Sequence, residues 1–125
     1  MRSLFLLALA VTLSCNSQPS AVVGRQTGQT LVEQWFGVAA KPISERTPSD
    51  IELMRYAAGY LAGVADASQG KAWCYSRLVK AHEIDSELML AMREMPPDQL
   101  RTRAAADHVV YLLTKRFPCP RKEPQ

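Results

Sequence analysis

The sequence is short of the residues that most catalytic, metal and nucleic-acid sites need. It has two histidines and three cysteines in 125 residues, and they are scattered rather than set at metal-ligand spacing. Lysine and arginine form no long run, and the formal net charge is only +3, which argues against a nucleic-acid partner. Gly59 and Gly63 fall inside a helical pattern and form no phosphate-binding loop. We therefore predict a protein that is not an enzyme and binds no metal and no cofactor.

The two histidines have no acidic partner that would make a catalytic pair. Asp107 directly precedes His108, but neighbouring residues on a helix point in different directions. His82 stands beside Glu83 at the expected start of a helix, so we expect both histidines on the surface. A nucleophilic pair of Cys74 with His108 would conflict with a disulfide at Cys74.

Strand patterns are also missing. No stretch alternates apolar and polar residues between turn signals, and apolar residues recur instead at helical spacing. We therefore predict an all-α fold, a small single-domain bundle of about four helices. The expected helices are Gln29 to Val38, Asp50 to Ser68, Glu83 to Glu94, and Pro97 or Asp98 to Arg116, the last with a bend near Thr102.

Local sequence also predicts how these helices begin and end. Thr27 or Thr30 can cap the first helix, and Ser49 or Asp50 can cap the second, because their side-chain oxygens accept hydrogen bonds from free amides of the first turn. The basic residues at 115 and 116 suit the negative C-terminal end of the last helix.

The predicted core comes from one face of each long helix. A glycine in a helix interior costs roughly 1 kcal/mol relative to alanine, so we predict that another helix packs closely against Gly59 and Gly63. The expected buried faces are Ile51, Met54, Ala58, Leu61 and Ala65 in the second helix, Ile84, Leu88, Met89, Met92 and Met95 in the third, and Ala105, Val109, Leu112 and Leu113 in the fourth.

The N-terminal residues have the layout of a secretory signal peptide. Arg2 is followed by an apolar run from Leu4 to Leu13, which is too short to span a bilayer, since a spanning helix needs roughly 20 residues. Small and polar residues come next, as they do at a cleavage site. We predict a signal peptide over residues 1–20, a linker over 21–28, the helical domain over 29–119 and a tail over 120–125.

Cys15 allows two interpretations of this signal. Ser14 suits a lipoprotein signal, in which Cys15 carries a lipid that anchors the protein to the membrane, whereas Thr12 suits such a signal poorly. Ordinary cleavage between Ser14 and Ala21 is the alternative. Both interpretations lead to export, so we expect the protein in the periplasm, either free or membrane-anchored.

The exported domain keeps two cysteines, Cys74 and Cys119. Two cysteines in an exported protein usually pair, so we predict a disulfide between them. The loop it closes would stabilise the fold by about 4 kcal/mol in the chain-entropy model. A catalytic cysteine is the alternative, and it would need a lowered pKa and a neighbouring base.

One nine-residue motif carries a family resemblance. The stretch Gly59 to Ala67 reads GYLAGVADA, and it resembles the pattern G-Y-aliphatic-x-G-aliphatic-x-D-A of the Rap/Tai family of immunity proteins of type VI secretion systems. The resemblance continues through Cys74, a helix that ends at Pro96, and the sequence F-P-C at residues 117–119. It covers about residues 27 to 119.

The resemblance implies a small helical protein of the periplasm that binds a cognate peptidoglycan amidase effector and blocks it by occluding its cleft. The loop from Ser68 to Trp73 lies where a connecting loop precedes the family cysteine, so we nominate Gln69, Lys71 and Trp73 as partner contacts. For Trp73 there is an alternative, in which its ring packs over the disulfide.

This chain departs from the family pattern in two places. Many members carry a further cysteine pair, and the corresponding places here are Ala57 and the region of Trp35 and Phe36, so a second disulfide is absent. The family's C-x-P is replaced by Cys74-Tyr75-Ser76. An alternative function is a periplasmic stress chaperone or structural envelope protein, and both a monomer and a homodimer stay open.

Overall fold

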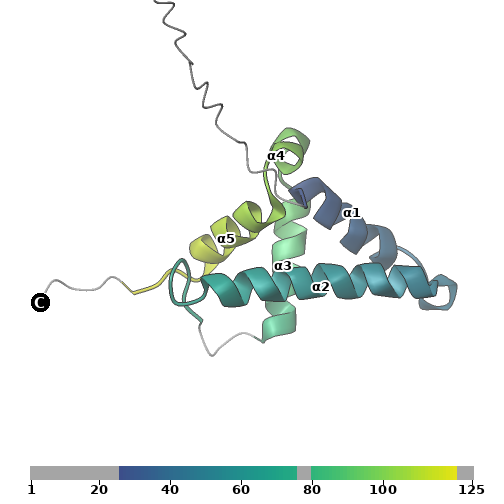
Figure 1. Ribbon diagram of the computed structural model, residues 1–125, viewed down its shortest axis with the longest axis horizontal. Helices are drawn as coiled ribbons and strands as arrows, with labels where there is room; N and C mark the ends of the chain where they lie inside the picture. The colour runs from purple at the N-terminus through teal and green to yellow at the C-terminus, as the bar shows by residue number, and fades with distance from the viewer. Residues whose placement is uncertain (1–25, 76–79, 121–125) are drawn as a thin grey trace, which may run out of the picture.

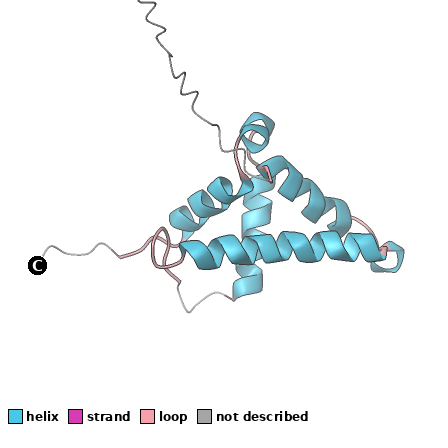
Figure 2. Cartoon of the chain, in the orientation of Figure 1, coloured by secondary structure: helices cyan, strands magenta, loops and turns pink. Residues whose placement is uncertain are grey.

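The computed structural model describes residues 26–75 and 80–120, and within these ranges it contains helices and no strands (Figures 1 and 2). The predicted all-α fold is thereby confirmed. The predicted signal peptide, Cys15 and the tail beyond Pro120 lie outside the described residues. The elements are α1 (Gly28–Ala39), a 3₁₀ helix η1 (Ile43–Glu45), α2 (Pro48–Ser68), α3 (Ala81–Arg93), α4 (Pro97–Thr102) and α5 (Ala105–Arg116).

The helices are arranged around α2, the longest of them. In Figure 1, α1, α2 and α5 frame a triangle, α3 crosses behind α2, and the short α4 lies beside the start of α1. α1 packs against α2, α3, α4 and α5, and α5 packs against α2 and α3 as well. The core therefore lies where α1, α2, α3 and α5 meet.

Caps on α1 and α2 explain where these helices begin. Thr27 Oγ1 accepts a hydrogen bond from Thr30 N at 3.2 Å, which confirms Thr27 as the cap of α1. At α2 the predicted caps are wrong, because Thr47 is the capping residue. Thr47 Oγ1 accepts from Asp50 N at 3.2 Å, while Thr47 N donates to Asp50 Oδ2 at 2.9 Å. Pro48 fits the first helical position, where no amide hydrogen is needed.

Asp50 also joins the start of α2 to the loop before it. Lys41 Nζ lies 2.7 Å from Asp50 Oδ1, and the Asp50 side chain is only 9% exposed. The hydrogen bond from Lys41, followed by those from the backbone and side chain of Thr47, lowers the pKa of Asp50 to about 2. A carboxylate in the first turn also suits the positive end of the helix.

The predicted fourth helix is two helices, α4 and α5, and the expected bend is a break in the helix. The break occurs because extended backbone from the start of the domain pairs here: Thr27 forms an antiparallel bridge with Ala104, and Ala105 N donates to Gln26 O at 2.8 Å. Gln26 is 4% exposed. The last residues of the predicted linker, 21–28, are therefore part of the folded domain.

His108 is buried, so its predicted surface position is wrong. Its Nε2 donates to Gln99 O at 3.1 Å, and the residue is 4% exposed. Gly28 lies against it so closely that a Cβ at position 28 would be 2.7 Å from His108 Cδ2 and 2.8 Å from a Leu100 methyl carbon. His82, in contrast, is exposed, as predicted.

The core confirms the predicted faces of the last helices and corrects that of α2. The α3 face and Ala105, Val109 and Leu113 of α5 are buried. On α2 the fully buried residues are Ala57 and Leu61. The buried residues of α3 are Ile84, Leu88, Met89 and Met92, with Met95, beyond its end, and Leu112 of α5 partly buried.

The prediction that another helix packs closely against Gly59 and Gly63 is wrong. Both are exposed, and a Cβ at either position would meet nothing within 4 Å. Ile51 is also 43% exposed. Small residues occupy nearly every side of α2, so the apolar pattern did not single out the face that is buried.

Tyr60 gives the motif on α2 a structural role. Its hydroxyl oxygen accepts a hydrogen bond from Ala106 N at 3.1 Å, in the first turn of α5. Burial, the largest effect, raises the pKa of Tyr60, so the hydroxyl is neutral in the folded protein. The motif thus joins α2 to the start of α5.

Candidate partner-binding site

The backbone of the loop after α2 is held in one conformation by hydrogen bonds. Gly70 has a φ of 74°, a left-handed conformation that glycine adopts at little cost. Gly70 N donates to Trp73 O at 2.7 Å, and the amides of Lys71 and Ala72 donate to Ser68 O at 3.2 and 3.0 Å. Three backbone hydrogen bonds therefore hold a tight turn, with Gly70 and Lys71 exposed at its tip.

Trp73 anchors this loop from beneath. Its indole Nε1 donates to Ala65 O at 3.0 Å and to Ser68 Oγ at 3.1 Å, and the residue is only 3% exposed. Its ring lies 6.0 Å from the Phe117 ring, centroid to centroid, at an angle of 53°. The side chain is therefore core, beside Cys74, as in the alternative considered for Trp73, and a partner would not meet it in this conformation.

Gln69 and Lys71 have the opposite environment, because both are exposed. Gln69 ends α2 in an extended conformation, with its amide bonded to Ala65 O at 2.9 Å. Lys71 Nζ lies 3.4 Å from Ala67 O, a long hydrogen bond at the C-terminal end of α2. Their role as partner contacts stays a prediction, and both residues are accessible to a partner from solvent.

The predicted disulfide between Cys74 and Cys119 is confirmed. The Cα atoms are 4.7 Å apart, and Cys74 N donates to Phe117 O at 3.0 Å. With the contact between the Trp73 and Phe117 rings, these links join the loop after α2 to the end of α5. We call these four residues, Trp73, Cys74, Phe117 and Cys119, the clamp.

A hollow lies on the loop side of the clamp, between α2 and α3. It holds about 140 Å³ and includes Gln69 and Trp73 in its wall. Asp85 also lines it, and burial raises the pKa of this carboxyl more than the charge of His82 lowers it. The other lining residues are Ala62, Ala65, Asp66, Tyr75, Ala81 and Ile84.

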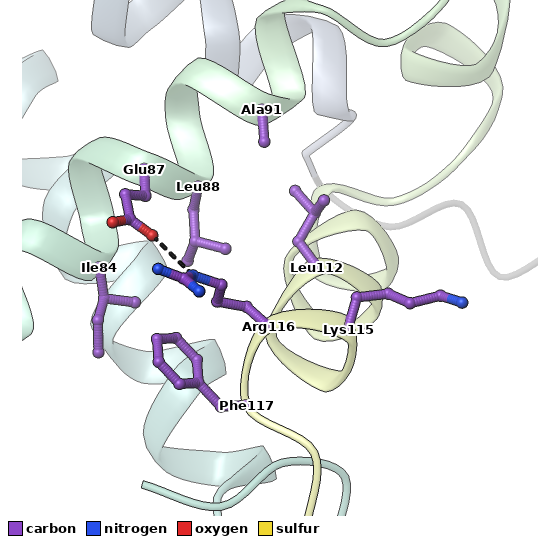
Figure 3. A pocket seen from close by; sticks show the side chains of 8 residues that line it. All are labelled: Ile84, Glu87, Leu88, Ala91, Leu112, Lys115, Arg116 and Phe117. Carbon is purple, nitrogen blue, oxygen red and sulfur yellow. Dashed lines mark hydrogen bonds and ion pairs between the residues drawn. The ribbon is translucent and has the colours of Figure 1, made fainter. Parts of the chain in front are cut away.

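A larger hollow lies on the other side of the clamp, between α3 and α5 (Figure 3). It holds about 260 Å³, and we call it the α3–α5 groove. Its floor is apolar, and one ion pair crosses it, from Arg116 Nε to Glu87 Oε2 at 3.1 Å. The lining residues are Ile84, Glu87, Leu88, Ala91, Leu112, Lys115, Arg116 and Phe117.

Sequence reasoning did not find this groove. The basic residues at 115 and 116 were assigned only to the end of a helix, and Ala91 was given no role. The one feature of the sequence that could have indicated the groove is Ala91, because a small residue on α3 opposite Leu112 leaves the space between α3 and α5 open.

Residues 26–75 and 80–120 contain no group of three or more histidine, cysteine, aspartate or glutamate side chains that could hold a metal ion. No helix in the same two ranges is long and apolar enough to cross a membrane. The exposed loop and the apolar groove are therefore the two candidate surfaces for a ligand or a partner.

Comparison with protein families says which binding domain this is. The chain matches the family model of Rap1a immunity proteins over residues 27–119, and it belongs to that family. The predicted family is thereby confirmed. The protein is therefore an immunity protein, its partner is a cognate secreted toxin, and such families are generally non-enzymatic. A search of curated proteins finds no match to the chain.

Proposed function

We propose that the protein is exported to the periplasm, where it binds and inhibits a type VI secretion amidase that cleaves peptidoglycan, by occluding the catalytic cleft. The observation that carries this proposal is membership of the Rap1a immunity protein family over residues 27–119. The disulfide between Cys74 and Cys119 supports export, because disulfides persist in oxidising compartments. The signal-like pattern of residues 1–20 supports it as well.

The loop after α2 is the element that we propose enters the cleft. Its tip is exposed, and its backbone is held by the hydrogen bonds at Gly70, Lys71 and Ala72 and by Trp73 beneath it. A loop already fixed in one conformation loses little entropy on binding, which favours affinity. Lys71 supplies a cationic group at the tip, and Gln69 supplies a polar group beside it, at the end of α2.

The test is production of the amidase encoded next to this protein's gene in the periplasm of a host, with and without this protein. We expect the protein to prevent lysis and to purify with the amidase. Lys71→Glu should weaken the complex about tenfold or more, as loss of an interface anchor does. Arg55→Glu is the matched control, since Arg55 is exposed on α2 away from the loop, and it should leave affinity within about twofold.

Two results would count against the proposal in different ways. If lysis is the same with and without the protein and no complex forms, the protein does not inhibit that amidase. If the complex forms but Lys71→Glu and Arg55→Glu bind equally well, the loop tip is not the element that enters the cleft.

A further inference from the structure

The α3–α5 groove combines an apolar floor with an excess of positive charge. Ile84 and Leu88 on α3 are 5% and 4% exposed, and Leu112 of α5 lies opposite them (Figure 3). The lining residues include one acidic side chain, Glu87, and two basic ones, Lys115 and Arg116, so the groove carries one net positive formal charge. An occupant with a large apolar group and a negative charge would match both features.

Arg116 is the group that would meet that negative charge. Within residues 26–75 and 80–120, its guanidinium makes one hydrogen bond, from Nε to Glu87, and the side chain is 61% exposed. No described residue bonds Nη1 or Nη2, and this fork of N–H donors matches the two oxygens of a carboxylate. The guanidinium carbon lies 5.7 Å from the centre of the Phe117 ring, at the edge of the apolar floor.

We infer that the α3–α5 groove is a second docking site for the toxin, and that it takes a segment with a large apolar side chain next to a carboxylate. The apolar side chain lies between Leu88 and Leu112, and the carboxylate binds the Nη atoms of Arg116. This inference rests on the proposed function, because the toxin is the partner that it assigns to the groove.

The clamp is the reason that one partner can use both the loop and the groove. Phe117 lines the groove, and its ring contacts Trp73, which anchors the loop. Ile84 lines both the groove and the hollow beside the loop. The two surfaces are therefore adjacent, and a toxin bound at the loop tip has a second contact within reach.

The first test uses the complex of the purified protein with the amidase and measures its dissociation constant. Arg116→Gln removes the guanidinium that would bind the carboxylate of the toxin, and it should weaken the complex about tenfold. Glu87→Gln breaks the same ion pair, leaves the Arg116 fork intact and removes a carboxylate that would repel that of the ligand, so it should tighten the complex, the opposite of Arg116→Gln. Ala91→Trp fills the groove and should weaken binding at least as much, while Ser86→Trp, exposed on α3 outside the groove, should not.

The second test needs no toxin. N-acetylphenylalanine carries an aromatic ring and a carboxylate, and its amide lacks the charge. In NMR titrations of the protein, the acid should shift the methyl signals of Ile84, Leu88 and Leu112, and the amide should bind at least about threefold more weakly. Arg116→Gln should remove this difference between the two compounds.

The outcomes separate this inference from the proposed function. If the amidase binds and Arg116→Gln and Ala91→Trp leave its affinity unchanged, or if Glu87→Gln weakens it as much as Arg116→Gln, the docking inference is wrong and the function stands. If no amidase complex forms, the function fails, and with it the assignment of the toxin to the groove. If the probe binds only after residues 121–125 are removed, or if Ala91→Trp turns a dimer into a monomer, the occupant is this chain itself and the inference is overturned.

Discussion

Replacing the two cysteines of the clamp should remove much of the stability of this fold. The disulfide joins residues separated by 45 positions. For a loop of that length the loop-entropy expression gives about 4 kcal/mol at room temperature, from an entropy of about 13 cal/mol/K. Domains of this size are stabilised by about 5–15 kcal/mol in total, so the Cys74→Ser/Cys119→Ser variant should retain only part of its stability.

Urea unfolding of the oxidised protein and of this double variant measures the difference. With a slope of about 1–2 kcal/mol per molar urea, the midpoint should fall by about 2–4 M. In the native state, the bond from Cys74 N to Phe117 O and the contact between the Trp73 and Phe117 rings do not depend on sulfur, so the variant should still fold. A loss of stability below about 1 kcal/mol, or free thiols in the purified protein, would refute the reasoning.

Four further changes test the fold. Gly28→Ala should cost about 1–3 kcal/mol in unfolding free energy, because its Cβ would overlap the His108 ring; no loss would mean that the ring can move away. Gly63→Ala should stabilise α2 by up to about 1 kcal/mol, and a thermal melt that shows a loss would imply a contact at that face. Asp50, with its pKa lowered to about 2, should contribute stability above about pH 4 that is lost as the pH falls towards 2, so Asp50→Asn should flatten acid unfolding curves; curves of equal steepness would contradict this. Tyr60→Phe should cost about 1 kcal/mol in chemical unfolding, and an unchanged midpoint would mean that the bond to α5 adds nothing.

Local sequence predicted most of the helices, because their signals lie within a few residues of one another. The apolar stripe of α3 from Ile84 to Met92 has the helical spacing and is buried. The Thr27 cap lies three residues before the amide that it accepts from. The disulfide was predictable from the cysteine count once export was assumed.

Features that depend on distant parts of the chain were missed. The break between α4 and α5 follows from pairing with residues 26–28, nearly 80 positions earlier in the chain. The same segment covers His108, which local sequence placed on the surface. The α3–α5 groove depends on the distance between two helices, which no local pattern describes. Trp73 is buried in the core, where its ring packs against Phe117, a residue 44 positions later in the chain.

The pairing of Gln26 with Ala105 places the start of the described chain at one end of α5. The chain enters the fold beside the first residue of α5, and the clamp lies just beyond the last. α5 has 12 residues, and at 1.5 Å per residue it separates the two points by about 18 Å. The point where the chain enters the described fold and the clamp, with the loop and the groove beside it, therefore lie at opposite ends of α5.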